Sequence, residues 1–169
     1  AMGRALGACG GWALHGDPAS LQLLREATQW IEERGGAVST SLNHGWLVEA
    51  TASLGLEVEA RRHAAQLMRR VRAADRHGEA MGCRALARLA AARGDRTRAM
   101  QYLQQANASA ALRQSPREQT VNDLARGEVL AALGQAAEAR PLAESAIERF
   151  ERMGMPWHAG RAREWLARV

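Results

Sequence analysis

Apolar residues return at helical spacing along nearly the whole chain, and short polar or glycine-containing stretches interrupt them. The segment 60–77 is the clearest case, because Ala60, Ala64 and Leu67 fall on one side of a helix while arginines occupy the other. Spacing of this kind predicts helices over 3–14, 18–33, 37–53, 56–76, 79–92, 95–113, 116–132 and 136–152, with a ninth opening at Pro156. The pattern therefore predicts an all-α fold.

Several predicted helix ends carry specific signals. Asp17 precedes Pro18, an arrangement typical of an N-cap followed by proline at the first helical position. Residues 115–118 read Ser-Pro-Arg-Glu, which is a capping box with proline in the same place. The pair at 35–36, Gly-Gly, predicts the end of the second helix. Pro141 lies inside the eighth predicted helix, where its missing N–H predicts a kink.

Four glycines mark the turns between paired helices. They are Gly16, Gly55, Gly94 and Gly134, separated by 39, 39 and 40 residues. A fixed period of this length is typical of solenoids. We therefore predict about four and a half helix-turn-helix repeats of 39–40 residues in a single domain spanning 3–169. Their expected bounds are 3–35, 36–77, 78–114 and 115–154, followed by a capping helix at 155–169.

Small residues follow the turn glycines at a constant distance. The pairs are Gly55/Ala60, Gly94/Ala99 and Gly134/Ala139, with Leu67, Ala106 and Ala146 seven positions further on. In this spacing the chain resembles the tetratricopeptide repeat (TPR), in which small residues let the two helices of a unit approach closely. The 39–40-residue period is similar to the long-repeat variant in MalT-like LuxR-type regulators and in some bacterial adenylate cyclases. The resemblance implies a right-handed α-α superhelix, a TPR-like solenoid, that senses or recruits and does no chemistry.

The resemblance also implies a concave ligand groove walled by the first helix of each repeat. Carried over by distance from the turn glycines, the groove residues are Asn43, Trp46, Glu49, Arg84, Arg88, Asn122, Glu128, Arg161 and Arg168. Four equivalent positions alternate in charge, namely Glu49, Arg88, Glu128 and Arg168. Because neighbouring helices pack about 8–10 Å apart, this alternation predicts a ladder of ion pairs across the groove.

Two groove positions have alternative interpretations. Trp46 and Trp165 are equivalent, and each either lines the groove or fills space between neighbouring helices. Asn43 and Asn122 are equivalent to each other but lack the basic partners with which some TPR proteins clamp a C-terminal carboxylate. Recognition of a peptide C-terminus in that manner is therefore not expected.

Composition agrees with a helical protein. The 169 residues are 47% hydrophobic and 4% aromatic, which favours closely packed helices over a sheet sandwich. No apolar run approaches the roughly 18 residues of a membrane span. Cys9 and Cys83 make a poor disulfide framework, so we expect a cytoplasmic protein without a membrane anchor. The first two residues, Ala-Met, resemble a cloning scar and are excluded from the repeats.

The net charge is +5, and every basic residue is arginine. The strongest charge feature is a basic stripe on the predicted helix 56–76, formed by Arg61, Arg62, Arg69, Arg72 and Arg76. At about 100° per residue these side chains share one face. Such a stripe would suit the phosphates of a nucleic acid. The alternative is a solvated outer face, since second helices of TPR units lie on the convex side.

Candidate catalytic and metal-binding patterns are missing from the sequence. The histidines are scattered at positions 15, 44, 63, 77 and 158, without a pair at i, i+4 beside a carboxylate. We interpret them as structural or solvent-facing residues. The chain has no phosphate loop, dinucleotide fingerprint or serine elbow. The sequence thus predicts a protein that is not an enzyme and needs no metal or cofactor.

Three functions are compatible with these patterns. The leading hypothesis is an interaction or sensing module of a larger bacterial signalling or transcription regulator, binding a protein or peptide in the concave groove. The second is a small-molecule effector site in a glycine-opened pocket near Gly7, Gly10, Gly45 and Trp46. The third is contact with nucleic acid through the basic stripe. A homodimer formed through the terminal repeats is a further expectation.

Overall fold

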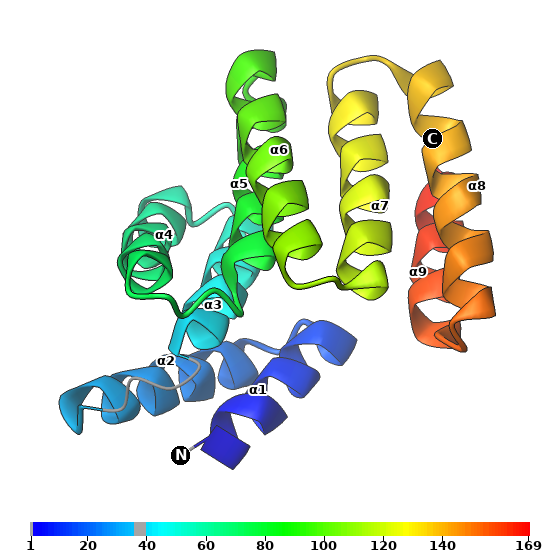
Figure 1. Ribbon diagram of the computed structural model, residues 1–169. Helices are drawn as coiled ribbons and strands as arrows, with labels where there is room; N and C mark the ends of the chain where they lie inside the picture. Colours follow the sequence, from blue (N-terminus) through cyan, green and yellow to red (C-terminus); the bar gives the residue numbers. More distant parts are fainter. Residues whose placement is uncertain (1, 36–39) are drawn as a thin grey trace. The chain divides into compact units, whose positions relative to one another are not determined.

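The computed structural model describes residues 2–35 and 40–169, and the regular structure within these ranges is entirely α-helical (Figure 1). The helices are α1 (Met2–His15), α2 (Pro18–Glu33), α3 (Thr40–Ser53), α4 (Glu57–Arg72), α5 (Glu79–Ala92), α6 (Arg96–Leu112), α7 (Pro116–Ala132), α8 (Ala136–Arg152) and α9 (Pro156–Leu166). The all-α prediction is confirmed. Ala1 of the expected cloning scar, Gly36 and the first residues of the predicted helix 37–53 lie outside the described residues.

The chain forms two compact units, residues 1–85 and 86–169, and the boundary falls inside α5. In the first unit α1 packs against α2, α3 packs against α4, and α2 also contacts α3. In the second unit α7 packs against α8, while α6 contacts α7 and α8 contacts α9. Neighbours in sequence are thus neighbours in space within each unit, as expected for helix-turn-helix pairs (Figure 1).

Alanine is the commonest of the buried hydrophobic residues. The residues predicted to be small or apolar in each repeat are all completely buried, namely Ala60, Leu67, Ala99, Ala106, Ala139 and Ala146. Larger side chains fill the remaining space, with Leu24 and Leu47 in the first unit and Phe150 in the second. The short alanine side chain sets the spacing, because the distance between packed helices depends on the residues at the contact.

Left-handed backbone ends nearly every helix at a fixed interval. The four predicted turn glycines, at 16, 55, 94 and 134, all have positive φ, between 62° and 81°. A second set of left-handed residues, which the sequence analysis missed as a set, comprises Gly35, Ala74, Gln114 and Gly154. These positions are separated by 39, 40 and 40 residues, so both turns of the repeat have the same period. The four predicted turn glycines therefore lie in left-handed turns, and a second turn recurs at nearly the same interval.

The helix predicted over 56–76 ends earlier, at Arg72. Ala74 adopts a left-handed conformation with φ of 69°, and the amide of Asp75 donates to the carbonyl of Arg70 at 3.0 Å, so the helix cannot continue. The Asp75 carboxylate accepts bonds from the Ser41 amide and hydroxyl, at 2.9 and 2.6 Å. Asp75 therefore caps the start of α3 from the end of α4, which explains the early termination.

Side-chain caps are present at three helices, and the two predicted ones, Asp17 and Ser115, are among them. Asp17 accepts bonds from the amides of residues 19 and 20, and Ser115 accepts one from that of Glu118. Asp95, which was not predicted as a cap, accepts a bond from the amide of Arg98. The carboxylate of Glu118 contacts Arg113 and Arg117.

α8 continues through Pro141 to Arg152. Of the helices in the described ranges, none combines the length and apolar character needed to cross a bilayer.

The left-handed conformation of Gln114 gives a direct test of the second turn. A non-glycine residue in this region costs about 1–2 kcal/mol, so Gln114→Gly should raise the free energy of unfolding by about 0.5–1 kcal/mol after the added flexibility of the unfolded chain is subtracted. The same replacement at exposed Gln104, in the middle of α6, should lower it by about 1 kcal/mol. Urea unfolding of both variants measures the difference, and a loss of stability in Gln114→Gly would contradict the assigned turn.

Candidate binding cleft between α2, α3 and α4

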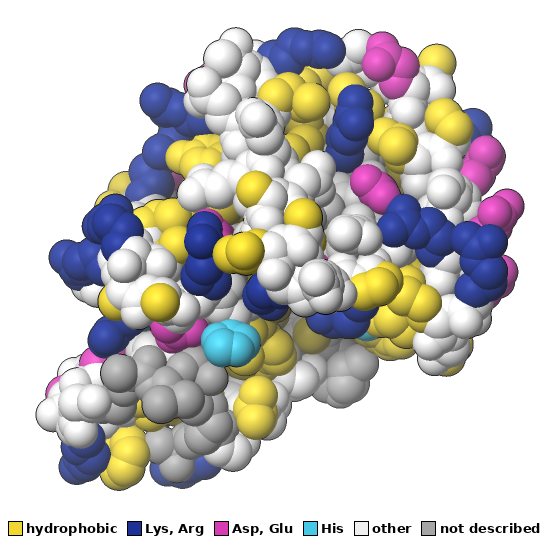
Figure 2. Space-filling view, viewed as in Figure 1, with side chains coloured by type: hydrophobic (Ala, Val, Ile, Leu, Met, Phe, Trp, Pro, Cys, Tyr) yellow, Lys and Arg dark blue, Asp and Glu magenta, His cyan; other side chains and the backbone are white. Residues whose placement is uncertain are grey.

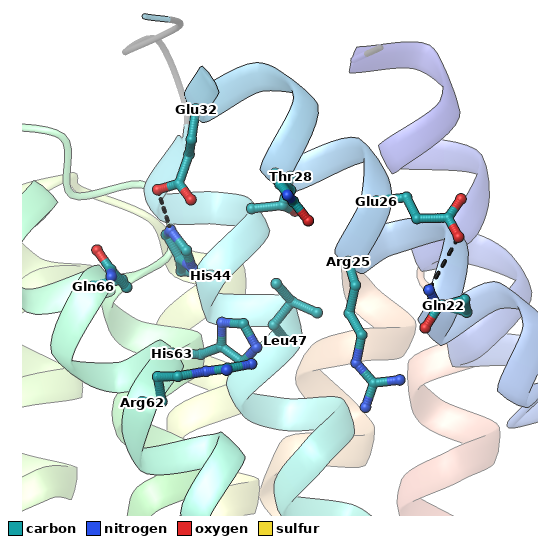
Figure 3. A pocket seen from close by; sticks show the side chains of 11 residues that line it. Gln22, Arg25, Glu26, Thr28, Glu32, His44, Leu47, Arg62, His63 and Gln66 are labelled. Carbon is teal, nitrogen blue, oxygen red and sulfur yellow. Dashed lines mark hydrogen bonds and ion pairs between the residues drawn. The ribbon is translucent and has the colours of Figure 1, made fainter. Parts of the chain in front are cut away.

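A surface cleft of about 420 Å³ opens in the first unit between three helices. α2 lines it with Gln22, Arg25, Glu26, Thr28, Gln29 and Glu32, α3 with His44 and Leu47, and α4 with Arg62, His63 and Gln66. Figure 3 shows His44, Leu47 and His63 facing the space between α2 and α4. The volume lies in the range of about 300–1,000 Å³ typical of ligand sites, but most of the lining side chains are polar.

Two buried histidines form the inner surface of the cleft. His44 is 2% exposed and His63 is 9% exposed, with ring centroids 5.7 Å apart. His44 Nε2 lies 3.0 Å from Glu32 Oε1 in a hydrogen bond, and its Nδ1 has no hydrogen-bond partner. Neither nitrogen of His63 has a hydrogen-bond partner, although its Nε2 lies 3.4 Å from Glu59 Oε1. Buried nitrogens of this kind are candidates for ligand contacts, because protein interiors seldom leave polar atoms unpaired.

Two ion pairs join α2 to α4 beside the histidines. Arg25 donates from Nε and Nη2 to the two carboxylate oxygens of Glu59, at 2.7 and 2.8 Å. Arg70 donates to Glu32 at 3.4 Å. On α2 the two paired residues are seven positions apart, which is about 10 Å along one helix face. The ion pairs therefore hold the two walls at separate points along the cleft.

Burial and hydrogen bonding set the charges of these groups. Burial lowers the pKa of His44 and of His63, and in both cases this effect outweighs the neighbouring carboxylate. Burial alone would raise the pKa of Glu32, but bonds from His44 and Arg70 hold that pKa below its ordinary value. The bidentate bond from Arg25 lowers the pKa of Glu59. At neutral pH the cleft thus contains neutral imidazoles beside ionised carboxylates.

A second hollow of about 600 Å³ adjoins the cleft at the turn between α3 and α4. The two hollows share Gln22, Arg25 and Arg62. The second hollow is lined in addition by Leu56 and Val58, and Val58 is 87% exposed. A polar cleft and an apolar surface therefore lie side by side.

Leu56 differs from the capping residues of two other repeats. Its equivalents Asp17 and Asp95 cap the helices that follow them, whereas Leu56 before α4 and Gln135 before α8 make no side-chain capping bond. A missing cap of this kind costs about 1 kcal/mol. The α3–α4 turn thus exposes aliphatic surface at a position where two other repeats have a capping aspartate.

The residues predicted for the concave groove differ widely in exposure. Asn43, Arg84 and Asn122 are almost completely buried, so in this structure they are packed inside and are not displayed to a ligand. Trp46 and Glu49 are partly buried, and Trp46 packs against the core of the first unit. Helix packing explains this outcome for Asn43, since nine of the fourteen residues of α3 are buried. A ligand-binding role for the more exposed groove residues stays a prediction.

One step of the predicted ion-pair ladder is present. Arg88 Nε lies 2.5 Å from Glu128 Oε2, and both residues belong to the second unit. Arg168 follows the end of α9 at Leu166, so the fourth position of the ladder is not on a helix. Arg161 lies exposed on α9, near the ring of Trp157 and 4.0 Å from Glu164.

The basic stripe is shorter than predicted. Arg61, Arg62, Arg69 and Arg72 are exposed on α4, and Figure 2 shows basic side chains gathered where Figure 1 places this helix. Arg76 lies beyond the helix and pairs with buried Glu79 at 2.8 Å, so its inclusion in the stripe was wrong. Contact with nucleic acid through the remaining arginines stays a prediction.

The predicted glycine-opened pocket is wrong at Gly45. Gly45 is buried, and a Cβ atom there would lie 2.7 Å from the carbonyl oxygen of Gly78. Because glycine has no side chain, the backbone of Gly78 packs closely against Gly45, and no space for an effector is left at this position. Both Gly7 and Gly10 lie on α1 with no neighbouring atom at the Cβ position, and neither lines the cleft.

The sequence analysis missed the pair of histidines. His63 lies three residues after Ala60 and four before Leu67, which places it on the apolar face of the helix. The same repeat position holds Tyr102 and Leu142 in later units. A histidine at a core position was thus a signal of a functional residue that the sequence does contain. Local metal-binding spacing does not reveal it. The convergence of His63 with His44 depends on the helix pairing and is not visible in local spacing.

Metal-binding clusters and reactive thiols can be assessed among the residues that the structure describes. Among those residues, no cluster of three or more His, Cys, Asp or Glu side chains has metal-binding geometry. Cys9 and Cys83 are free and buried, and burial raises the pKa of each thiol, that of Cys83 to about 12. Both thiols are therefore poor nucleophiles at neutral pH.

Comparison of the chain with protein-family models, curated proteins and solved structures found no match. The TPR resemblance accordingly rests on the residues and spacing of the chain itself.

The depressed histidine pKa values predict a pH-dependent stability. Between the folded and unfolded pKa values the unfolded chain binds more protons, so the free energy of unfolding should fall as pH decreases from 8 to 5.5. The slope contributed by each histidine is at most about 1.4 kcal/mol per pH unit. Replacing either ring, His44→Gln or His63→Gln, should flatten the slope. Exposed His77→Gln serves as the control and should retain it. Urea titrations across this range measure the slope, and an unchanged slope in both buried variants would refute the assignment.

Proposed function

We propose that the chain is a TPR-like α-solenoid that serves as an interaction module of a larger bacterial signalling or transcription regulator. In this proposal it binds a segment of a partner protein in the cleft between α2, α3 and α4. The observation that carries the proposal is the continuity of the polar cleft with the apolar hollow through Gln22, Arg25 and Arg62. A protein segment offers both polar and aliphatic groups along its length, as this surface requires.

The repeat architecture supports a binding role. Both turns of the repeat have left-handed residues at intervals of 39–40, and the small residues expected at helix contacts are buried. Stacked helix pairs of this kind present extended surfaces, and repeat proteins use such surfaces for recognition.

The proposed site lies on a different set of helices from the groove implied by the resemblance. Its walls come from the second helices of two hairpins, α2 and α4, and its inner surface from α3. Burial of the groove residues Asn43 and Arg84 makes the cleft the better candidate in the first unit. The buried nitrogens of His63 add hydrogen-bonding capacity at this site.

A small-molecule effector is the second candidate, and one observation favours it. The cleft alone, at about 420 Å³, is large enough for a small polar metabolite. Such a ligand would leave the exposed aliphatic hollow at Leu56 and Val58 without a role. We therefore favour the protein segment, which uses both surfaces.

Blocking the cleft should abolish binding. We expect dodecapeptides selected from a random displayed library to bind the wild-type protein with micromolar affinity and to lose at least tenfold in affinity, about 1.4 kcal/mol, with Gln66→Trp. Gln66 is a partly exposed residue of α4 that lines the cleft, so the bulky ring should fill it without disturbing the core. Gln101→Trp places the same ring on an exposed face of α6 in the second unit and should bind normally. Equal affinities for the two variants, measured by isothermal titration calorimetry, would place the binding surface elsewhere.

A further inference from the structure

Three basic side chains converge on a single carboxylate oxygen at one end of the cleft. Glu59 Oε1 lies 2.7 Å from Arg25 Nε, 3.8 Å from Arg62 Nη2 and 3.4 Å from His63 Nε2. Arg25 uses two of its donors in the bidentate bond with Glu59. Within the described ranges Arg62 has this long contact alone, and 68% of its side chain is exposed. This end of the cleft therefore has more hydrogen-bond donors than acceptors.

The carboxylates around the cleft already have partners. Glu59 accepts both bonds from Arg25, Glu32 accepts from His44 and Arg70, and Glu26 accepts the Gln22 amide at 3.0 Å. The groups without a short hydrogen bond are Arg62, which is a donor, and the buried His63 ring, whose neutral form has one N–H donor and whose protonated form has two. The ligand group that fits between them is therefore a hydrogen-bond acceptor. A negatively charged acceptor forms the strongest hydrogen bonds with an arginine.

We propose that the cleft takes a carboxylate of an acidic, aliphatic segment of a partner protein between Arg62 and His63, and that His63 gains a proton when this segment binds. The proposal rests on the proposed function and adds the chemistry of its ligand. The neighbouring hollow supplies the aliphatic contact through Leu56 and Val58. A segment with an acidic side chain close to an aliphatic one would contact both the cleft and the hollow.

The proton uptake follows from the groups that surround His63. From α2 it faces Arg25 and, beyond His44, Glu32; from α3 it faces His44; from α4 it faces Glu59 and Arg62. In the free protein burial and nearby positive charge keep the ring neutral. A ligand carboxylate adds negative charge and an acceptor at the ring, and both changes favour the imidazolium form. Binding should therefore strengthen as pH falls.

The test measures the binding of selected peptides as a function of pH. Dodecapeptides are selected from a random displayed library on the full 169-residue chain and are synthesised with blocked termini. We expect the selected sequences to combine Asp or Glu with Leu, Ile or Val. Affinity at pH 6 should exceed that at pH 8 by about five- to tenfold, within the limit of tenfold per pH unit for one proton. Titration calorimetry in buffers of different ionisation enthalpy should show uptake of close to one proton.

Matched variants assign the effect to the two residues. Arg62→Gln should weaken binding about tenfold or more, while Arg72→Gln, an exposed arginine of α4 outside both hollows, should leave it unchanged. His63→Gln should remove most of the pH dependence and the proton uptake. His63→Tyr, which introduces the side chain of the equivalent position Tyr102, provides a second variant if the first does not fold.

Other results would overturn the proposal while leaving the proposed function intact. Selected peptides without acidic residues, equal effects of Arg62→Gln and Arg72→Gln, or proton uptake that persists without His63 would each contradict it. By contrast, complete competition by free citrate or glutamate would identify a small carboxylate as the occupant and would overturn the proposed function as well. Peptide binding that is insensitive to Gln66→Trp would instead reject the site itself.

Discussion

The fold depends on a left-handed residue at the end of helix after helix. With φ positive at Gly55, Gly94 and Gly134, the chain leaves the helical path and reverses, and the next helix packs on the previous one. The same change of direction occurs at Ala74 and Gln114, where a Cβ atom makes it costly. Because the interval between these residues is nearly constant, α1 to α8 have similar lengths, between 14 and 17 residues, and buried alanines recur at equivalent positions of the repeats.

The candidate cleft coincides with two particular residues of the second repeat. In α4 a histidine occupies a position that Tyr102 and Leu142 hold elsewhere, and Leu56 stands where two other repeats have a capping aspartate. Both changes cost stability in the first unit: one buries a polar ring with unpaired nitrogens, and the other leaves a helix start without a side-chain cap. Departures of this kind, at adjoining positions, are typical of a surface under functional constraint.

The sequence predicted the helices well because their signals are local. Asp17, Ser115 and the turn glycines determine where helices begin and end from neighbouring residues alone. The end of α4 was missed because it depends on Asp75 reaching Ser41, a contact 34 residues apart. The cleft was missed for the same reason, since His44 and His63 meet only after α3 and α4 pair. Asn43 and Arg84 were expected to line a groove because the resemblance indicates which face of a helix each residue occupies. It does not indicate whether that face is buried in this chain, and both residues are buried.

The bond between Asp75 and Ser41 has a consequence for the cooperativity of the fold. The first turn of α3 receives bonds from Asp75, a residue 34 positions further along the chain, so this contact forms when a loop of 34 residues closes. Part of the stability of α3 is thereby coupled to the formation of α4 and of the turn after it. The α3–α4 hairpin should consequently open and close as one cooperative unit.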